Sequence, residues 1–163
     1  MEYWDIYDLN GNKTNKIRKK GDKLEQGEYH LAMEAWIVNS NGNILIQKRS
    51  EKCEILPGVW GLTTGRMISG ENTIEGCIRE VKEEIGLNIS KEDLNFVRRI
   101  FRTDLIWDIY LIKKDAQINE LNLQENEVSE VKWVSIDEFN KMLDEKLLFK
   151  YPEIQEILLH IQK

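Results

Sequence analysis

The sequence predicts an α/β fold, in which a mixed β-sheet carries helices on its faces and follows an N-terminal β-hairpin. Three observations support it: two Asn-Gly turns between alternating segments, one amphipathic helix with caps at both ends, and the order of the segments. Strands, a helix, further strands and then helices follow one another, which is typical of such sheets. At 163 residues, of which 41% are hydrophobic, the chain is long enough for one domain with a real core.

The first strands are predicted from the Asn-Gly dipeptides at residues 10–11 and 41–42. Asn-Gly is a strong hairpin signal because both central residues of a type I′ turn need a positive φ. Each dipeptide is flanked by segments with the alternation of a strand. We therefore expect two hairpins, which join Trp4–Tyr7 to Lys13–Ile17 and Leu31–Val38 to Asn43–Arg49.

The central helix is predicted over Thr73–Ile85. Asn72 can cap its N-terminus, with Glu75 as the capping-box partner three residues later. Gly86 supplies the left-handed position that ends a helix. Helical spacing places one apolar stripe toward the core, made of Ile74, Cys77, Ile78, Val81 and Ile85.

The remaining elements follow from the same signals. A capping-box pair at Ser135 and Glu138 starts a short helix, and Pro152 fits the first turn of a last helix. We expect one domain over residues 1–163, with a hairpin extension (1–29), a core (30–145) and a C-terminal helix (146–163). Strands are predicted near Val59–Thr64, Leu94–Arg102, Leu105–Lys113 and Val131–Val134.

Three carboxylates crowd the polar face of the central helix near its C-terminal end. Like charges one turn apart repel each other, and the macrodipole disfavours anions at this end. Glu80, Glu83 and Glu84 therefore cost stability unless a cation binds them, which indicates a divalent metal site. Arg79, four residues before Glu83, can pair with it. Gly76 lies one turn before Glu80, where we expect it to leave room for a ligand or another backbone.

Residues 65–87, GRMISGENTIEGCIREVKEEIGL, resemble the signature of the Nudix hydrolases at every defined position. The resemblance implies the Nudix fold, an α/β/α sandwich around a mixed sheet. It also implies a pyrophosphohydrolase that acts on acid anhydrides in phosphorus-containing compounds, with Mg²⁺ as cofactor and Mn²⁺ as a substitute. The expected substrate is a small molecule with a diphosphate linkage, most simply a nucleoside diphosphate derivative.

The resemblance also implies roles for individual residues. One of the three glutamates or a downstream acid would activate the attacking water, and the sequence does not decide which. Two arginines close to the site in the sequence are expected to bind the substrate, because Arg contacts phosphate bidentately. The expected metal ligands are Glu80, Glu84, Glu83, the Gly65 carbonyl and Glu127; Arg79 joins the three glutamates as catalytic, Arg49 and Arg66 bind substrate, and Glu71 and Gly86 are supporting.

Two alternatives stay open. The segment from Asp5 to Trp60 also resembles the isopentenyl-diphosphate isomerase branch of the superfamily, which needs a cysteine before the first signature glycine and a histidine after it. Thr64 and Arg66 stand there instead, and Cys53 lies in the preceding loop. The second alternative is a non-catalytic nucleotide sensor, which the complete set of glutamates disfavours.

Charge and composition exclude several classes of protein. A net charge of −6 argues against a protein that coats nucleic acid. The first residues lack a secretory signal, and no apolar run reaches the roughly 18 residues that span a bilayer. Two cysteines cannot form a disulfide framework. We expect a cytoplasmic protein without a stable nucleic-acid or membrane partner; its oligomeric state stays open, a homodimer being one alternative.

Overall fold

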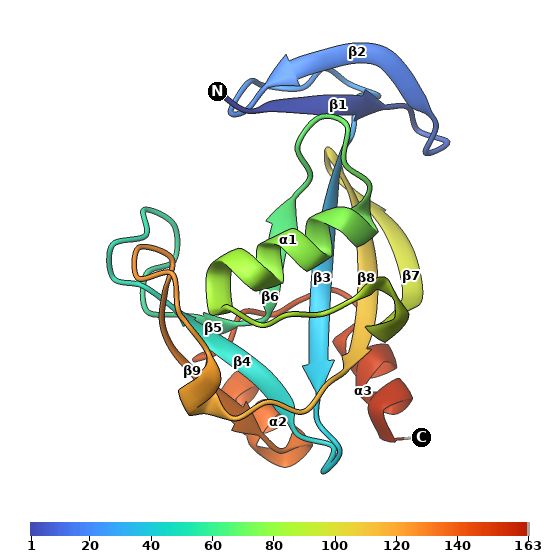
Figure 1. Cartoon of the computed structure of the whole chain (residues 1–163). Helices are drawn as coiled ribbons and strands as arrows, with labels where there is room; N and C mark the ends of the chain where they lie inside the picture. Colours follow the sequence, from blue (N-terminus) through green and yellow to red (C-terminus); the bar gives the residue numbers. More distant parts are fainter. Residues whose placement is uncertain (163) are drawn as a thin grey trace.

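The structure is a computed structural model that describes residues 1–162. A seven-stranded mixed sheet lies between one helix on its front face and two helices behind it, and a separate two-stranded hairpin packs at one end (Figure 1). The predicted mixed sheet with helices on both faces is therefore confirmed. Lys163, the last residue of the predicted C-terminal segment, lies outside the described residues.

The sheet is built around one long buried strand, β3. Its central order is β5-β4-β3-β8-β7, while β6 pairs with β3 and β9 pairs with β4. Strands β3 and β8 are parallel, and the other named pairs are antiparallel. The strands are β1 (Tyr3–Tyr7), β2 (Lys13–Lys19), β3 (His30–Val38), β4 (Ile44–Arg49), β5 (Trp60–Gly61), β6 (Thr63–Arg66), β7 (Leu94–Arg102), β8 (Leu105–Lys113) and β9 (Val128–Val134).

The strand predicted at Val59–Thr64 is two strands, β5 and β6, which pair with different neighbours. The break falls at Leu62, whose backbone N–H donates to the hydroxyl of Tyr151 at 3.0 Å. The Leu62 N–H is therefore bonded to a side chain of the C-terminal segment and not to a neighbouring strand, which interrupts the continuous strand that we expected.

The helices are α1 (Thr73–Ile85), α2 (Ile136–Asp144) and α3 (Ile154–Gln162), with short 3₁₀ turns at Lys91–Asp93 and Ile118–Glu120. The bounds and both caps of α1 agree with the prediction, including the capping box of Asn72 with Glu75 and the left-handed Gly86 (φ 72°). The buried face of α1 differs from the predicted apolar stripe at one position, however: Ile74, which we expected to be buried, is 38% exposed. Thr73 turns inward in its place and donates to the buried carboxylate of Asp108 at 2.6 Å.

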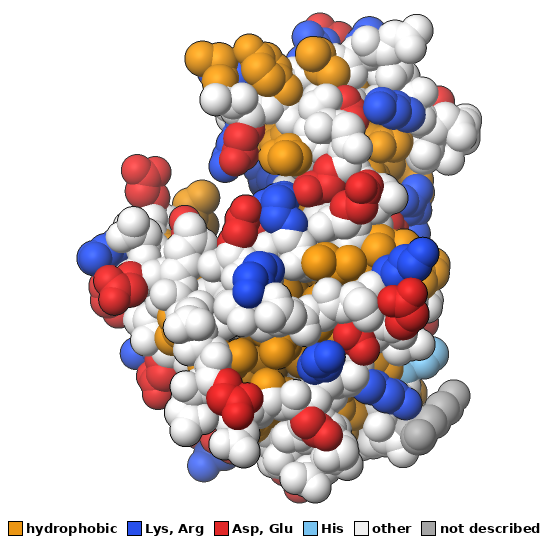
Figure 2. All heavy atoms as spheres, in the orientation of Figure 1, with side chains coloured by type: hydrophobic (Ala, Val, Ile, Leu, Met, Phe, Trp, Pro, Cys, Tyr) orange, Lys and Arg blue, Asp and Glu red, His pale blue; other side chains and the backbone are white. Residues whose placement is uncertain are grey.

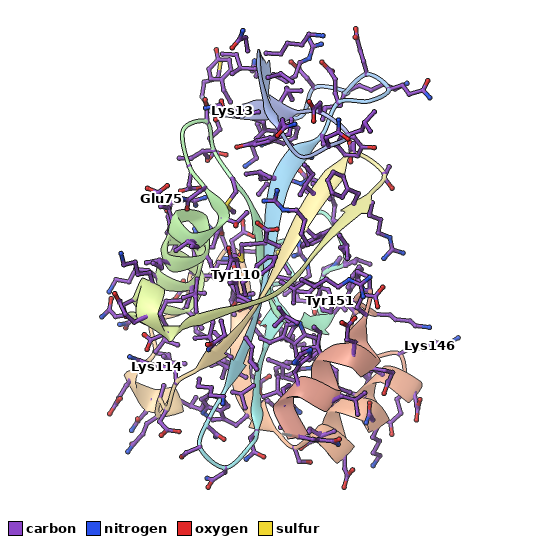
Figure 3. All side chains as sticks on the ribbon, turned by 90° about the vertical axis from the view of Figure 1, so that its right-hand side faces the viewer. Lys13, Glu75, Tyr110, Lys114, Lys146 and Tyr151 are labelled. Carbon is purple, nitrogen blue, oxygen red and sulfur yellow. The ribbon has the colours of Figure 1, made fainter. Side chains whose placement is uncertain are left out.

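The last helix begins at Ile154 and not at Pro152. Glu153 has a φ of 61°, which lies in the left-handed region and cannot continue a right-handed helix. The segment before it is non-helical, and Leu148 and Tyr151 are buried in the core on the α2 and α3 side of the sheet. Tyr110 lies between α1 and the sheet, whereas Tyr151 lies on the opposite side (Figure 3).

The N-terminal hairpin is anchored to the loop that leads into α1. Trp4 and Ile6 of β1 are buried. Between them the Asp5 carboxylate accepts hydrogen bonds from the Ser69 hydroxyl (2.6 Å) and the Gly70 backbone N–H (2.7 Å). The hairpin thereby holds the start of α1, and so the helix that carries the three carboxylates.

Candidate active site

Arg79 is the centre of the charged cluster on α1. Its Nε and Nη2 donate to the two oxygens of Glu71 at 2.7 and 2.8 Å. Its Nη1 donates to Glu80 at 2.9 Å and to Glu83 at 3.2 Å. Such a planar, bidentate arrangement fixes both the guanidinium and its partners. Figure 2 shows acidic and basic side chains lying close together over this face of α1.

Glu80 packs directly against the backbone of β6. A Cβ atom at Gly65 would lie 2.5 Å from the Glu80 Cδ and 2.6 Å from its Cγ. Glycine is therefore required at residue 65 for this carboxylate to occupy its place. Burial raises the pKa of Glu80, and the charge of Arg79 opposes that rise.

Glu84 is partly buried one turn further along α1. Its Oε2 accepts a hydrogen bond from the Gln47 amide at 3.1 Å. The Gln47 oxygen in turn accepts from the Thr63 hydroxyl at 2.7 Å. Burial raises the pKa of Glu84 to about 8, and the nearby charges of Glu80 and Glu127 add to the rise. The anion of Glu84 is thus poorly compensated by the protein itself.

Glu80 and Glu84 fit a divalent cation. Both carboxylates lose solvation by burial and repel each other, so a positive ion between them would remove an electrostatic cost. In the part of the chain that the structure describes, no three His, Cys, Asp or Glu side chains form a complete metal cage. Magnesium commonly uses one or two carboxylates and completes its shell with water and substrate phosphates. The pair is therefore suited to a half-site that substrate completes.

Sequence reasoning missed Gln47 and Thr63, which hold Glu84 in place. The signal available in the sequence was a polar residue, Gln47, on a strand otherwise rich in isoleucine and leucine. In the structure this glutamine is only 8% exposed. Unpaired polar groups are rarely buried, so a buried glutamine on β4 indicates a partner. Its partners come from β6 and α1, which the sequence alone could not place beside it.

Three other predicted site residues differ from Glu80 and Glu84 in their exposure and contacts. Glu83 is 52% exposed and bound to Arg79. Glu127 is exposed in the loop before β9, close enough to Glu84 to affect its pKa. Gly86 ends α1, and a Cβ there would lie 2.8 Å from the Asn122 backbone nitrogen.

Gly76 makes room for a side chain, and not for the ligand or the other backbone that we expected. It is buried, and a Cβ at this position would overlap the side chain of Met67. The residue is thus a packing glycine between α1 and the segment after β6, because the Met67 sulfur occupies the volume that a side chain would need.

A pocket of about 410 Å³ opens beside the carboxylates. Glu84 and Gly65 line it on one side, together with both predicted substrate-binding arginines, Arg49 and Arg66. Arg49 is held in place because its Nε donates to the Ile55 carbonyl at 2.8 Å. The rest of the wall is largely apolar and aromatic, with Trp60, Leu105, Trp107, Phe149 and Tyr151 among its residues.

Comparison with known proteins identifies the family of this chain. The model of the NUDIX domain family matches residues 28–156. Nudix hydrolase lin0387 of Listeria innocua is 37% identical over 139 residues, which are 83% of this chain and 80% of that protein. The crystal structure of DR0079 from Deinococcus radiodurans has a TM-score of 0.77 at 18% identity and covers 99% of this chain and 100% of its own. An isopentenyl-diphosphate Delta-isomerase of Citrobacter koseri is 30% identical over 86 residues, 52% of this chain and 48% of that enzyme.

Proposed function

Because this chain belongs to the Nudix hydrolase family, we propose that it is a metal-dependent pyrophosphohydrolase that cleaves the diphosphate linkage of a small, nucleotide-linked molecule. One observation carries the proposal: Glu80 and Glu84 are partly buried on one face of α1, where Arg79 pairs with Glu80 but not with Glu84, and Glu84 lines a pocket that also holds two arginines. A cation and a diphosphate together would complement this set of charges.

Glu80 and Glu84 would hold Mg²⁺, or Mn²⁺ in its place, with Glu83, the Gly65 carbonyl and Glu127 as further candidate ligands. When bound, such an ion neutralises phosphate charge and polarises the phosphoryl group toward attack by water. Arg79 keeps Glu80 and Glu83 in fixed positions through its hydrogen bonds.

The substrate's charged end is assigned to the two arginines of the pocket. Arg49 and Arg66 supply the positive charge in a wall that also contains Glu84, a few uncharged polar side chains and many apolar ones. The flat, apolar surfaces of Trp60 and Trp107 suit a ring system attached to the diphosphate. This division of the pocket supports a nucleotide-linked substrate.

The positions of the two thiols favour hydrolysis over the isomerase alternative. Cys77 is fully buried in α1, and the Cys53 sulfur contacts the backbone carbonyl of Glu127 at 3.5 Å. Neither residue lines the pocket of about 410 Å³. A carbon-protonating isomerase of the kind that uses a cysteine beside the first signature glycine would need a thiol there.

We also place the protein in the cytoplasm, where its two free cysteines would stay reduced. Within residues 1–162, no helix is both long and apolar enough to cross a bilayer. We further propose that the hairpin, core and C-terminal segment form one Nudix domain, since buried residues of all three pack against the same sheet.

The test is release of phosphate and pyrophosphate from a panel of nucleoside triphosphates, nucleotide sugars, dinucleotides and non-nucleotide diphosphates, with and without Mg²⁺ or Mn²⁺. We expect metal-dependent turnover that Glu84→Gln lowers about hundredfold or more, because a metal ion contributes several kcal/mol to catalysis. Glu120→Gln, at an exposed glutamate outside the pocket, is the control. Metal-independent turnover, or full activity of Glu84→Gln, would contradict the proposal.

A further inference from the structure

Arg66 lies at the end of β6, next to the residues of the proposed metal site. Its neighbour Gly65 packs against the Glu80 side chain, and its own backbone carbonyl accepts a hydrogen bond from Arg79 Nη2 at 3.4 Å. Arg66 is exposed and lines the pocket of about 410 Å³. Its positive charge therefore lies beside the space in which we place the diphosphate.

The guanidinium of Arg66 keeps its hydrogen-bond donors free. Within residues 1–162, its side chain donates no hydrogen bond and pairs with no carboxylate. In contrast, Arg79 donates to three carboxylates, and the Nε of Arg49 donates to the Ile55 carbonyl. Because an arginine is a donor on all of its side-chain nitrogens, Arg66 can offer its full set of N–H groups to phosphate oxygens.

An aromatic ring of the N-terminal hairpin holds this side chain. The Cζ atom of Arg66 lies over the ring of Trp4, at 5.3 Å from the ring centroid. This distance is within the range of a cation–π contact, in which the ring attracts the guanidinium without using its N–H groups. The contact therefore restrains the position of the charge and leaves the donors to a ligand.

Trp4 is itself fixed in place. It is 3% exposed, and its ring packs against the ring of His30 at the start of β3, with 4.0 Å between the centroids. Beside it in β1, the backbone carbonyl of Tyr3 accepts a hydrogen bond from the Ser69 N–H at 2.8 Å. Figure 1 shows the hairpin over the end of the core where β3 begins and β6 ends. Strand β1 is thus tied to the segment that directly follows Arg66.

His30 adds no competing charge near pH 7. Burial lowers its pKa to about 4, and the charge of Arg66 adds to this effect. The imidazole is therefore neutral at a pH where the guanidinium is charged. Trp4 consequently meets a neutral ring at His30 and a cation at Arg66.

We propose that Trp4 is a positioning residue for substrate binding, which holds the Arg66 guanidinium at the pocket with its N–H groups available to the diphosphate. The N-terminal hairpin would thereby belong to the substrate site, although no residue of the segment 1–29 lines the pocket. This inference rests on the proposed function, since it takes a diphosphate as the ligand of Arg66.

The test is calorimetric titration with methylenediphosphonate, a diphosphate analogue whose bridge cannot be hydrolysed, both in EDTA and in excess Mg²⁺. Arg66→Met should bind it at least about tenfold more weakly, a loss typical of one hydrogen bond to a charged group. Trp4→Leu should weaken binding about two- to fivefold, as expected for a lost cation–π contact. Trp4→Phe keeps an aromatic ring and should lose less than Trp4→Leu.

A double-mutant cycle separates positioning from packing. In the Arg66→Met background, Trp4→Leu should cause no further loss of affinity, because the charge that Trp4 holds is already absent. Ile6→Val, at another buried residue of β1, is the matched control and should lower the melting temperature without changing the affinity. Thermal melting verifies that each variant folds. Should Trp4→Leu not fold, Trp4→Phe in the same two backgrounds measures the coupling, with an effect of about twofold expected.

Wild-type affinity in the folded Trp4 variants would overturn the inference. An equal loss in the wild-type and Arg66→Met backgrounds would also overturn it and would make Trp4 a packing residue only. No binding of the analogue by the wild-type protein at about 1 mM, roughly the weak limit for a specific ligand, would have the same consequence.

Turnover of the substrate panel by the same variants keeps the two proposals apart. Coupling between Trp4 and Arg66 without metal-dependent turnover would overturn the proposed function alone. Metal-dependent turnover without this coupling would overturn the role of Trp4 alone.

Discussion

The variant Gly65→Ala should impair catalysis while leaving the fold intact. The added Cβ would lie 2.5 Å from Cδ, 2.6 Å from Cγ and 2.9 Å from Oε1 of Glu80. Carbon atoms in contact are normally about 3.5–4.0 Å apart, so the Glu80 side chain must retreat by about 1 Å. A misplacement of about 1 Å can cost on the order of a hundredfold in rate. We therefore expect kcat/KM to fall about a hundredfold, or about 2.7 kcal/mol of transition-state stabilisation.

The fold should survive because the clash involves the flexible end of a side chain, and Gly65 does not have a left-handed φ. Steady-state kinetics and Mn²⁺ titration calorimetry measure the effect, and thermal melting verifies folding. The same substitution in a Glu80→Gln background is the control, where it should have little further effect because the displaced ligand is already lost. Wild-type kcat/KM and metal affinity in Gly65→Ala would refute this account of Glu80.

Two further predictions concern stability. Gly76→Ala should lower the free energy of unfolding in urea by about 1–3 kcal/mol, since its Cβ overlaps Met67, although alanine is the better helix former; an unchanged midpoint would show that Met67 simply moves aside. Burial raises the pKa of Glu34 from 4.5 to about 7. The pKa of Glu34 is higher in the folded than in the unfolded protein. Its contribution to the free energy of unfolding is therefore complete below pH 4.5 and is lost as the pH rises past about 7. Relative to Glu34→Gln, the free energy of unfolding of the wild-type protein, measured by chemical denaturation, should fall by up to about 3 kcal/mol across this pH range. Burial lowers the pKa of His30 to about 4, which gives a pH dependence of the opposite sign, but this contribution is common to both proteins and cancels in the comparison. Parallel pH profiles of the two proteins would contradict the assignment.

Local signals in the sequence determined the helix that carries the site. The bounds of α1, its capping box and its terminal glycine depend on hydrogen bonds between residues three or four apart, so neighbouring letters suffice to predict them. The crowding of Glu80, Glu83 and Glu84 on one face follows from helical spacing in the same way. The Nudix resemblance rested on this same stretch, and the comparisons confirm the family.

Tertiary structure decided which way each element faces. Ile74 was predicted to be buried, but Thr73 takes the inward position because Asp108 of β8 offers it a hydrogen bond. Gly76 faces Met67 rather than a ligand for a similar reason, since a residue nine positions earlier occupies its space. Which residues of a helix face inward thus depends on contacts with other elements, and helical periodicity does not specify these contacts.

The sequence by itself determined a carboxylate helix of the Nudix type, because the spacing of charges along one helix is a local property. Only the tertiary structure decided what surrounds it. Gln47 reaches Glu84 from β4, and Tyr151 reaches the end of β5 from a segment about ninety positions away. Glu34 is buried between Thr64 and Ile109 through the register of β3 with β6 and β8. Strand register and long-range packing are set by the whole core at once, so the walls that select a substrate appear only when the chain is folded.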